Sequence, residues 1–348
     1  MTLPDFSLPR LEIAHKRIAA SVHRTPLIHS RTLSDRVGAE VWLKCENLQK
    51  TGAFKVRGAL NRLLTLSDKE RTRGVATISA GNHAQAVAWA ASATGVQSVV
   101  VMPEHASPTK VRASQEYGAE VILHGDASAA FKRVLEVSEE RGLTFVHPFD
   151  DEEVVAGHAS CGLEILEDAP TVGTVVIPVG GGGLSSAISV ALAASGSDAA
   201  IWGVEPRGAA GMHDSLAARH AVHLDRVDTI ADGLGAPMAG VLNHAILEEY
   251  AEGVVLVDDA EIIAALALIL ERTKLLVEPS GAAGLAAMLS GQIQVDPDRP
   301  VVIVLSGGNA DLEQLASLLA QRDGSSNDPL ATGTSATSPP DENPSASD

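Results

Sequence analysis

The chain has 348 residues, of which 45% are hydrophobic and 20% charged, so it can form two domains with real cores and has the composition of a globular protein. Its formal net charge of −18 comes from 44 acidic against 26 basic residues, and the absence of a basic stripe argues against nucleic acid as a partner. The two cysteines, Cys45 and Cys161, lack a CxxC spacing, so the sequence implies neither a disulfide framework nor a cysteine-based zinc site.

The N-terminal residues 1–17 carry Asp5 and Glu12 and lack the apolar core of a signal peptide. The longest apolar runs, such as 262–270, are too short to span a bilayer. We therefore expect a soluble, cytoplasmic protein without a membrane partner.

Residues 1–73 predict the first elements. Apolar residues at helical spacing predict a helix over 11–22, and 29–34 has the pattern of a strand that leads into a short helix capped by Ser30 or Thr32. The run 41–47 predicts a strand and 59–64 a helix.

Between that strand and helix, Lys55 and Arg57 lie beside Phe54, within a stretch bounded by Gly52 and Gly58. A lysine at such a turn can have its pKa lowered by desolvation and a nearby cation, which makes the amine a nucleophile, Schiff-base former or proton carrier. Taken alone, the stretch fits a surface lysine at a helix start better. The glycine-rich turns downstream reverse that preference.

Residues 74–148 alternate regularly between short apolar strands and helices. The strands are predicted at 75–78, 98–102, 120–123 and 144–146, and the helices at 84–92, 108–117 and 128–141. This alternation indicates a parallel sheet covered on both faces. We expect 74–148 to form a small domain of its own.

A second alternation has strands at 172–179, 200–205, 254–257 and 301–305. The strand at 41–47 is expected to join this larger sheet, so that the small domain is inserted into a large domain made of 1–73 and 149–321. Residues 322–348 are rich in Ser, Pro, Asp, Asn, Thr and Gly, and this composition predicts a disordered acidic tail.

Three turns that contain glycine follow predicted strands, at 79–83, 180–184 and 306–309. Ligands of open α/β folds bind at the carboxyl ends of the strands, so these turns can converge on one crevice. The four consecutive glycines at 180–183 allow backbone N–H groups to surround an anion at a helix start, and a phosphate is the natural guest.

Other interpretations of the four glycines differ in strength. A nucleotide P-loop needs Gly-Lys-Ser/Thr after the glycines, and Leu184 stands there instead. A dinucleotide-binding turn remains an alternative, because Gly180 and Gly182 fit its first two positions and Glu205 ends the next strand, although Ser185 replaces the third glycine. A loop that serves tight packing only is the other alternative.

Lys55, a phosphate-binding loop and a shared crevice together suggest pyridoxal phosphate, held as a Schiff base. Six motifs, in order between Leu11 and Leu319, resemble those of the threonine/serine dehydratases, which are fold-type II pyridoxal-phosphate enzymes related to serine racemase and tryptophan synthase β. They are the segments 51–59, 79–85, 178–184, 203–206, 277–281 and 305–309. The resemblance implies an α/β fold of the tryptophan synthase β type, with two three-layer domains around parallel sheets and the cofactor between them.

The resemblance also implies roles for individual residues. Lys55 would form the Schiff base and move the α-proton, Phe54 would pack beside the cofactor ring, and Asn82 would bond the ring hydroxyl. Ser306 would meet the pyridine nitrogen. The phosphate would lie on the backbone N–H groups of Gly180, Gly181, Gly182, Gly183 and Leu184. The substrate carboxylate would lie on the loop formed by Ser79, Ala80, Gly81, Asn82 and His83.

Each of these residues also has a purely structural alternative. Asn82 would then stabilise a turn and Ser306 would cap a helix, but the joint order of the motifs favours the functional roles for both. For His83 we prefer a satisfied histidine at a helix start. We interpret Arg57 as structural and Cys161 as a small buried residue.

The sequence departs from the family pattern at several positions. Ala53 stands where the family usually has serine, and Ala80 where serine racemase has the serine that protonates the second face. Residues 156–160, which include His158, replace a Gly-Gln-Gly-Thr run. The related metal site is reduced to Glu205 and Ala209, because a glycine takes the place of its last ligand, so a divalent or monovalent cation there is doubtful.

These features predict a lyase that removes water from a β-hydroxy L-amino acid, with L-threonine or L-serine as substrate and a 2-oxo acid and ammonia as products. The alternatives are other substrates, namely 3-hydroxyaspartate, phenylserine or amino acids of hydroxyectoine catabolism, and a serine racemase-like isomerase. A nucleotide-binding oxidoreductase is a more distant alternative. A homodimer or homotetramer is expected from the resemblance.

Overall fold

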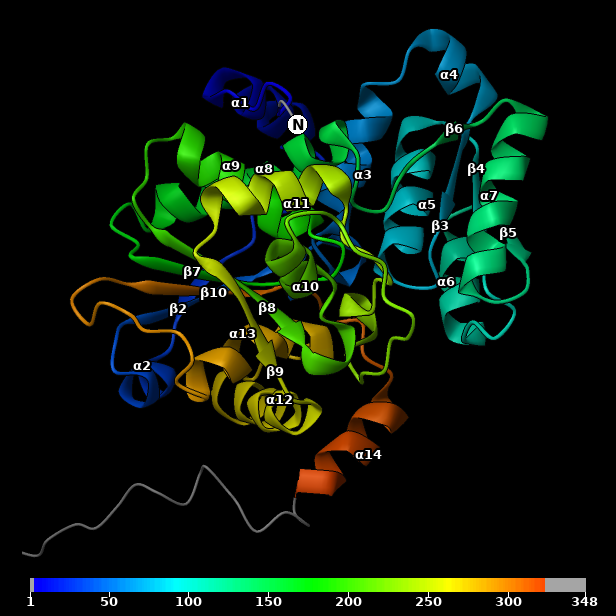
Figure 1. Cartoon of the computed structure of the whole chain (residues 1–348). Coiled ribbons are helices and arrows are strands. Elements are labelled where there is room, and N and C mark those ends of the chain that lie inside the picture. The colour runs from blue at the N-terminus through cyan, green and yellow to red at the C-terminus, as the bar shows by residue number, and fades with distance from the viewer. Residues whose placement is uncertain (1–2, 323–348) are drawn as a thin grey trace, which may run out of the picture.

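The computed structural model describes residues 3–322 of the chain, and within them the strands form two separate sheets (Figure 1). The larger sheet has the order β1-β2-β10-β7-β8-β9 and the smaller sheet has the order β5-β4-β3-β6. The predicted tail lies outside the described residues, apart from Arg322 at the end of the last helix.

In the larger sheet the strands run parallel, except that β1 is antiparallel to its neighbour β2. As expected, the early strand β2 joins this sheet, where it pairs with β10. The strands are β1 (Leu27–His29), β2 (Val41–Cys45), β7 (Thr174–Pro178), β8 (Ala200–Pro206), β9 (Gly253–Val257) and β10 (Val301–Leu305). Every residue of β7 and β10 is buried, because helices cover both faces.

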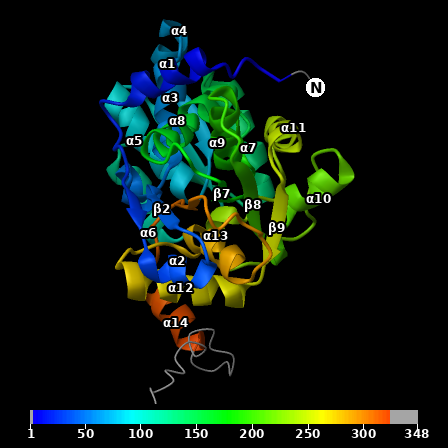
Figure 2. The same cartoon turned by 90° about the vertical axis from the view of Figure 1, so that its left-hand side faces the viewer.

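Two groups of helices cover the larger sheet, one on each face (Figures 1 and 2). One face carries α1 (Leu8–Ile18), α8 (Glu152–Asp168), α9 (Gly183–Ala194) and α11 (Val241–Tyr250). The other face carries α2 (Arg31–Val37), α12 (Asp259–Thr273) and α13 (Pro279–Leu289). The small residues of α13 permit close packing, since a Cβ on Gly284 would lie 3.0 Å from Ile303 of β10.

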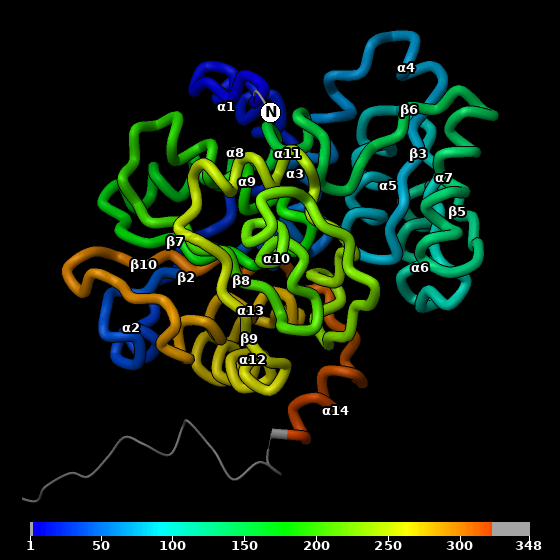
Figure 3. Tube along the Cα trace, viewed as in Figure 1, coloured from blue at the N-terminus to red at the C-terminus, as the bar shows by residue number. Residues whose placement is uncertain are grey.

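The remaining elements of this part are short or peripheral. Helix α10 (Gly211–Ala218) lies beside β9, and α14 (Leu312–Arg322) packs on α12. Four 3-10 turns complete it: η1 (Glu46–Leu48), η2 (Lys50–Gly52), η3 (Arg207–Ala209) and η4 (Asp232–Leu234). The tube in Figure 3 shows that α1 lies against α8 and α9, although these segments are far apart in the sequence.

The smaller sheet lies to the side of the larger one and is wholly parallel (Figure 1). Its strands are β3 (Val75–Ile78), β4 (Ser98–Met102), β5 (Glu120–Leu123) and β6 (Thr144–Phe145). The helices α5 (Asn82–Thr94), α6 (Pro108–Glu116) and α7 (Ala127–Arg141) follow its strands, and α4 (Asp68–Arg73) precedes them. The domain boundaries at 73/74 and 148/149 stay a prediction.

Helix α3 (Lys55–Leu64) joins the two parts, because it packs on both α8 and α5. It begins four residues earlier than the predicted helix, at Lys55 itself. Helix α8 was not predicted. All twelve residues from Val154 to Ile165 are buried, so the helix lacks the amphipathic period by which a helix is found in a sequence. No helix in 3–322 has the length and apolar character needed to cross a bilayer.

Candidate active site

Lys55 lies at the start of α3, with its amine turned into the protein. Its Nζ donates a hydrogen bond to the carbonyl oxygen of Pro148 at 2.8 Å and lies 5.0 Å from the centre of the Phe54 ring. Desolvation lowers the pKa of Lys55 to about 8, so the amine loses its proton near neutral pH far more readily than an ordinary lysine does. The expected contribution of a nearby cation is not found, because desolvation is the sole cause of the shift.

The nearby cation, Arg57, is instead held by a buried ion network. Its guanidinium donates to Glu46 through Nε and to Glu164 through Nη1, both at 2.8 Å, and all three side chains are almost fully buried. Lys44 binds the other oxygen of Glu164 at 2.6 Å. Arg57 therefore anchors α3 to β2 and α8, which agrees with the structural interpretation of this residue.

The segment that follows β6 links Lys55 to the glycine turn. Pro148 accepts the Lys55 hydrogen bond, and the next residue, Phe149, lies against the glycines: a Cβ on Gly181 would be 2.4 Å from its ring. The Phe149 carbonyl oxygen accepts a hydrogen bond from Asn243 at 3.0 Å, and the same amide donates to the carbonyl oxygen of Gly181. Asn243 thus ties the segment to the glycine turn.

The glycine turn has the geometry of an anion site at a helix N-terminus. Helix α9 begins at Gly183, and its N-cap residue Gly182 (φ +95°) provides no side-chain cap for the first N–H groups. A Cβ on Gly182 would lie 2.6 Å from Met212 and 2.7 Å from Asn243. The uncapped helix start and the absence of Cβ atoms fit a phosphate group.

Replacing Gly182 by alanine is expected to raise the dissociation constant of the cofactor at least about 10-fold, because the left-handed backbone and two close side chains must both give way. The constant can be measured by absorbance titration of the cofactor-free protein. Gly196→Ala is the matched control, since Gly196 has φ +72° but open space around its Cβ position. An equal loss of affinity in both variants would contradict the interpretation of the turn at 180–184 as the phosphate-binding site.

Asn82 begins α5 and is held from two sides. Its Nδ2 donates to Oε1 of Glu278 at 2.7 Å, and its Oδ1 accepts from Nδ2 of Asn309 at 2.9 Å. Asn309 also donates to the carbonyl oxygen of Thr51, and it packs against Gly52. These contacts bring the turns at 79–83 and 306–309 together beside the Lys55 stretch.

Ser306 is buried next to the lysine. Its carbonyl oxygen accepts the Phe54 N–H at 3.1 Å, and Ala53 forms an isolated antiparallel bridge with Gly307. The end of β10 therefore lies against the turn that carries Lys55. The role of Ser306 at the cofactor ring stays a prediction.

The loop between β3 and α5 forms a hydrogen bond within itself. The Ser79 hydroxyl accepts the Gly81 N–H at 3.0 Å, so this N–H already has a partner within the loop. His83 is buried, its Nε2 lies 3.5 Å from the Val146 carbonyl oxygen, and its Nδ1 has no partner within the described residues. The structure thus pairs one ring nitrogen of His83 within the described residues, and our interpretation of His83 as a satisfied histidine stays a prediction.

His158 lies in the middle of α8 and is fully buried. Its Nδ1 accepts the Gly58 N–H at 3.0 Å, in the first turn of the helix that begins at Lys55, and its ring packs edge-on against Phe54. Burial, the charge of Lys55 and neighbouring His83 and Arg57 hold the pKa of His158 well below its usual range, so the ring is neutral. The departure at 156–160 thus contacts the lysine turn directly.

Glu205 serves as a cap in the structure. Its two carboxylate oxygens accept the N–H groups of Met212 and His213 at 2.8 Å, at the start of α10. Burial raises the pKa of Glu205 to about 8, and these two bonds oppose the shift. In the described part of the chain, no group of three or more His, Cys, Asp or Glu side chains could hold a metal. A cation at Glu205 and Ala209 would therefore need ligands other than such side chains, and this site stays a prediction.

Sequence reasoning did not assign the residues that support the site, namely Phe149, Asn243, Glu278 and Asn309. Glu278 and Asn309 belong to the motifs at 277–281 and 305–309, so their positions were marked but their roles were not. Phe149 and Asn243 carry no local signal, because their contacts depend on segments far away in the sequence. Cys161 is buried and its thiol pKa is raised by burial, as expected for a packing residue.

Comparison with known proteins adds independent findings. Residues 18–307 match the family model described as pyridoxal-phosphate dependent enzyme. The chain is 44% identical, over 88% of its length and 76% of the relative's, to the L-threonine ammonia-lyase of Geobacter sulfurreducens. It resembles the crystal structure of a T.th. threonine deaminase with a TM-score of 0.83 and 40% identity, covering 88% of this chain and 99% of that one. It resembles maize serine racemase with a TM-score of 0.86 and 36% identity, covering 91% and 98%.

Proposed function

The chain belongs to the pyridoxal-phosphate-dependent enzymes, and on that premise we propose that it converts L-threonine, and also L-serine, to a 2-oxo acid and ammonia by loss of water. The observation that carries the proposal is the desolvated amine of the half-buried Lys55 at the start of α3, linked through Pro148 and Phe149 to an uncapped helix start at Gly183. The curated relative from Geobacter sulfurreducens acts on L-threonine by its name.

The residues present fit the cofactor. The turn at 180–184 would hold the phosphate on its backbone N–H groups, Phe54 would lie beside the ring, Asn82 would meet the ring oxygen and Ser306 the ring nitrogen. Pyridoxal phosphate, when bound there, supplies an aldehyde that condenses with amines and a ring that withdraws electrons from the substrate Cα. The support for this placement is that the Lys55 stretch contacts Ser306 through the Phe54 N–H, and that Asn309 bonds both Thr51 of this stretch and Asn82.

Lys55 would perform the proton transfer. A lysine amine with a pKa of about 8 is close enough to neutral pH to take a proton from the substrate Cα and to give one back. The substrate carboxylate would lie on the loop 79–83, at the start of α5, where N–H groups and the helix dipole favour an anion. The β-hydroxyl then leaves as water, and hydrolysis of the remaining enamine releases the 2-oxo acid and ammonia.

The test is to incubate the cofactor-loaded protein with L-threonine, L-serine, L-threo-3-hydroxyaspartate and phenylserine and to follow 2-oxo acid and ammonia. Turnover of L-threonine with equal amounts of both products is the expected result. Turnover of 3-hydroxyaspartate or phenylserine in its place would reassign the substrate. If none reacts while the cofactor is bound, dehydration is the wrong reaction.

Racemisation of serine is the second candidate function, because the maize serine racemase structure is similar. The residue that opposes it is Ala80, which offers no hydroxyl to protonate the second face of the substrate. Ala80→Ser is expected to raise D-serine formation from L-serine at least about 10-fold, since a positioned proton donor contributes roughly 10²–10⁴-fold in general acid catalysis. Chiral chromatography measures the product. Ala53→Ser adds a hydroxyl in a different turn, the one that carries Lys55, and should leave the rate of D-serine formation unchanged. D-serine formation by the unsubstituted protein would favour the racemase.

The same proposal includes a homodimer or homotetramer and a cytoplasmic location, both supported by the family resemblance. Light scattering during gel filtration measures the oligomeric state.

A cation at Glu205 and Ala209 also remains a proposal, and its support is the buried carboxylate of Glu205. If neither a chelator nor exchange of K⁺ for Na⁺ changes the activity, the proposal of a cation site is wrong.

A further inference from the structure

Glu278 is a buried carboxyl that the proposed contacts and proton transfers do not use. It immediately precedes α13, the residue is 8% exposed, and its Oε1 accepts the hydrogen bond of Asn82 at 2.7 Å. Asn82 begins α5 beside the smaller sheet, so this bond connects helices that pack on different sheets. The contact places Glu278 next to the residue proposed to meet the cofactor's ring oxygen.

The backbone holds the Glu278 carboxyl close to the turn at 306–309. A Cβ on Gly307 would lie 2.5 Å from its Oε1, and one on Gly233 would lie 3.4 Å away. The amide of Asn82 is oriented by Asn309, which donates to its Oδ1, so the NH₂ end is the one that faces Glu278. That NH₂ has two hydrogens: one bonds Glu278, and the other can reach a ring oxygen placed as proposed.

The carboxyl titrates near neutral pH. Burial raises the pKa of Glu278 to about 7, while the Asn82 hydrogen bond and the charge of Lys110 lower it and the charge of Asp232 raises it. These groups come from the elements that face Glu278: Asn82 from α5, Lys110 from α6 and Asp232 from η4. The carboxyl is mainly neutral at pH values well below 7 and mainly an anion at pH values well above 7.

Glu278 also lines a small open cavity of ≈ 40 Å³, through which solvent protons can reach it, together with Lys110, Asp232, Ser280 and Asn309 among others. Lys110 and Asp232 form an ion pair of 3.3 Å within this lining, with side chains 36% and 64% exposed. Glu278 therefore lies between a solvent-connected cavity and the Asn82 amide.

We propose that Glu278 is a positioning residue that acts through Asn82 and gives the bound cofactor its response to pH. The proposal rests on the proposed placement of the cofactor's ring oxygen at Asn82. When Glu278 is ionised, its charge disfavours further negative charge on the ring oxygen and favours a proton on the cofactor. When Glu278 is neutral, this bias is lost.

The test is the visible absorption of the cofactor-loaded protein as a function of pH, without substrate. The unchanged chain is expected to show a transition with a midpoint near pH 7. In Glu278→Gln, which keeps the oxygen that accepts the Asn82 bond but cannot titrate, the transition should disappear or move by about one pH unit or more. The control is Asp311→Asn, which alters a carboxyl of the same cavity lining whose own bonds go to Glu313 and Gln314. The same midpoint in Glu278→Gln and the unchanged chain overturns the proposal.

A second pair of variants tests whether Glu278 sets the pH response of the cofactor even if Glu278→Gln fails to fold or to hold the cofactor. Lys110→Met should move the midpoint up and Asp232→Asn should move it down, each by about 0.3 pH unit at low salt, and the double variant should largely cancel the two shifts. A purely structural role of Glu278 predicts no shift in either, and that result overturns the proposal. Because the titration requires a bound cofactor but no turnover, it is independent of whether the chain dehydrates threonine.

Discussion

Replacing Lys55 by alanine is expected to lower turnover of L-threonine by about three orders of magnitude or more, because the amine is both the proposed attachment point of the cofactor and the group that moves the substrate α-proton. The same variant should lose the visible band of lysine-bound cofactor. The amine has no substitute nearby, since Arg57 is locked by Glu46 and Glu164. Initial rates of 2-oxo acid formation and an absorption spectrum measure both effects.

Lys50→Ala is the matched control for this prediction. Lys50 belongs to the same turn, but its Nζ lies over the Trp89 ring, at 5.4 Å, whereas that of Lys55 bonds the Pro148 carbonyl oxygen. Its loss should leave the cofactor band in place and change turnover by less than about 10-fold. Equal loss of activity in Lys50→Ala and Lys55→Ala would mean that the turn is merely fragile and that Lys55 has no special role.

Replacing Arg57 by methionine is expected to lower the free energy of unfolding by about 3–5 kcal/mol, because it leaves buried carboxylates without their cation. The side chains of Arg57 and Glu46 are 0% exposed, and that of Glu164 is 2% exposed. In this variant the Glu164 carboxylate would still be paired with Lys44. Of the side-chain hydrogen bonds to the Glu46 carboxylate, only the one from the Thr25 hydroxyl would remain. Urea unfolding followed by circular dichroism measures the change.

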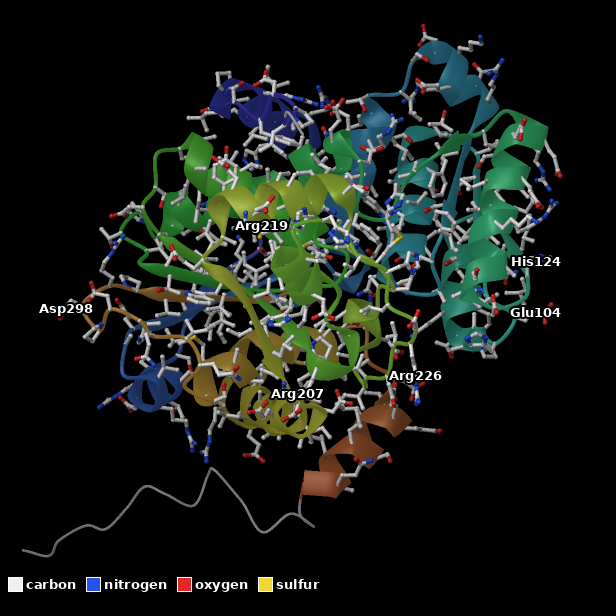
Figure 4. The ribbon with its side chains drawn as sticks, in the orientation of Figure 1. Glu104, His124, Arg207, Arg219, Arg226 and Asp298 are labelled. Carbon is white, nitrogen blue, oxygen red and sulfur yellow. The ribbon has the colours of Figure 1, made fainter. Side chains whose placement is uncertain are left out.

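The control for Arg57 is an exposed pair. Arg207 binds Asp258 at 2.9 Å with both side chains more than half exposed, and Figure 4 shows it at the surface near α12. Arg207→Met should therefore cost at most about 1 kcal/mol. Adding Glu46→Gln to Arg57→Met should recover part of the lost stability, because it removes the uncompensated charge. A double variant no more stable than Arg57→Met would refute the explanation by buried charge.

Much of the fold could be read from local patterns. The strands β3, β4, β5 and β10 are correct to the residue, because short β-branched runs between helices leave little choice of boundary. Helix boundaries were less accurate. The first helix starts at Leu8 and ends at Ile18 rather than spanning 11–22, since the proline near its start and the burial of its apolar stripe set its limits. Helix α8 was missed because burial on all sides removes the period on which such predictions rest.

The sequence by itself determined the chemistry of this protein: a lysine in a glycine-bounded turn, four glycines at a helix start and the order of six motifs identify a pyridoxal-phosphate enzyme. Only the tertiary structure decided how the side chains share charge and hydrogen bonds. It assigned the low pKa of Lys55 to desolvation alone, engaged Arg57 in a buried network, turned Glu205 into a helix cap and placed Glu278 against Asn82. The physical reason is that burial and pairing depend on segments that are distant along the chain, whereas a sequence motif contains only residues that are close together in the sequence.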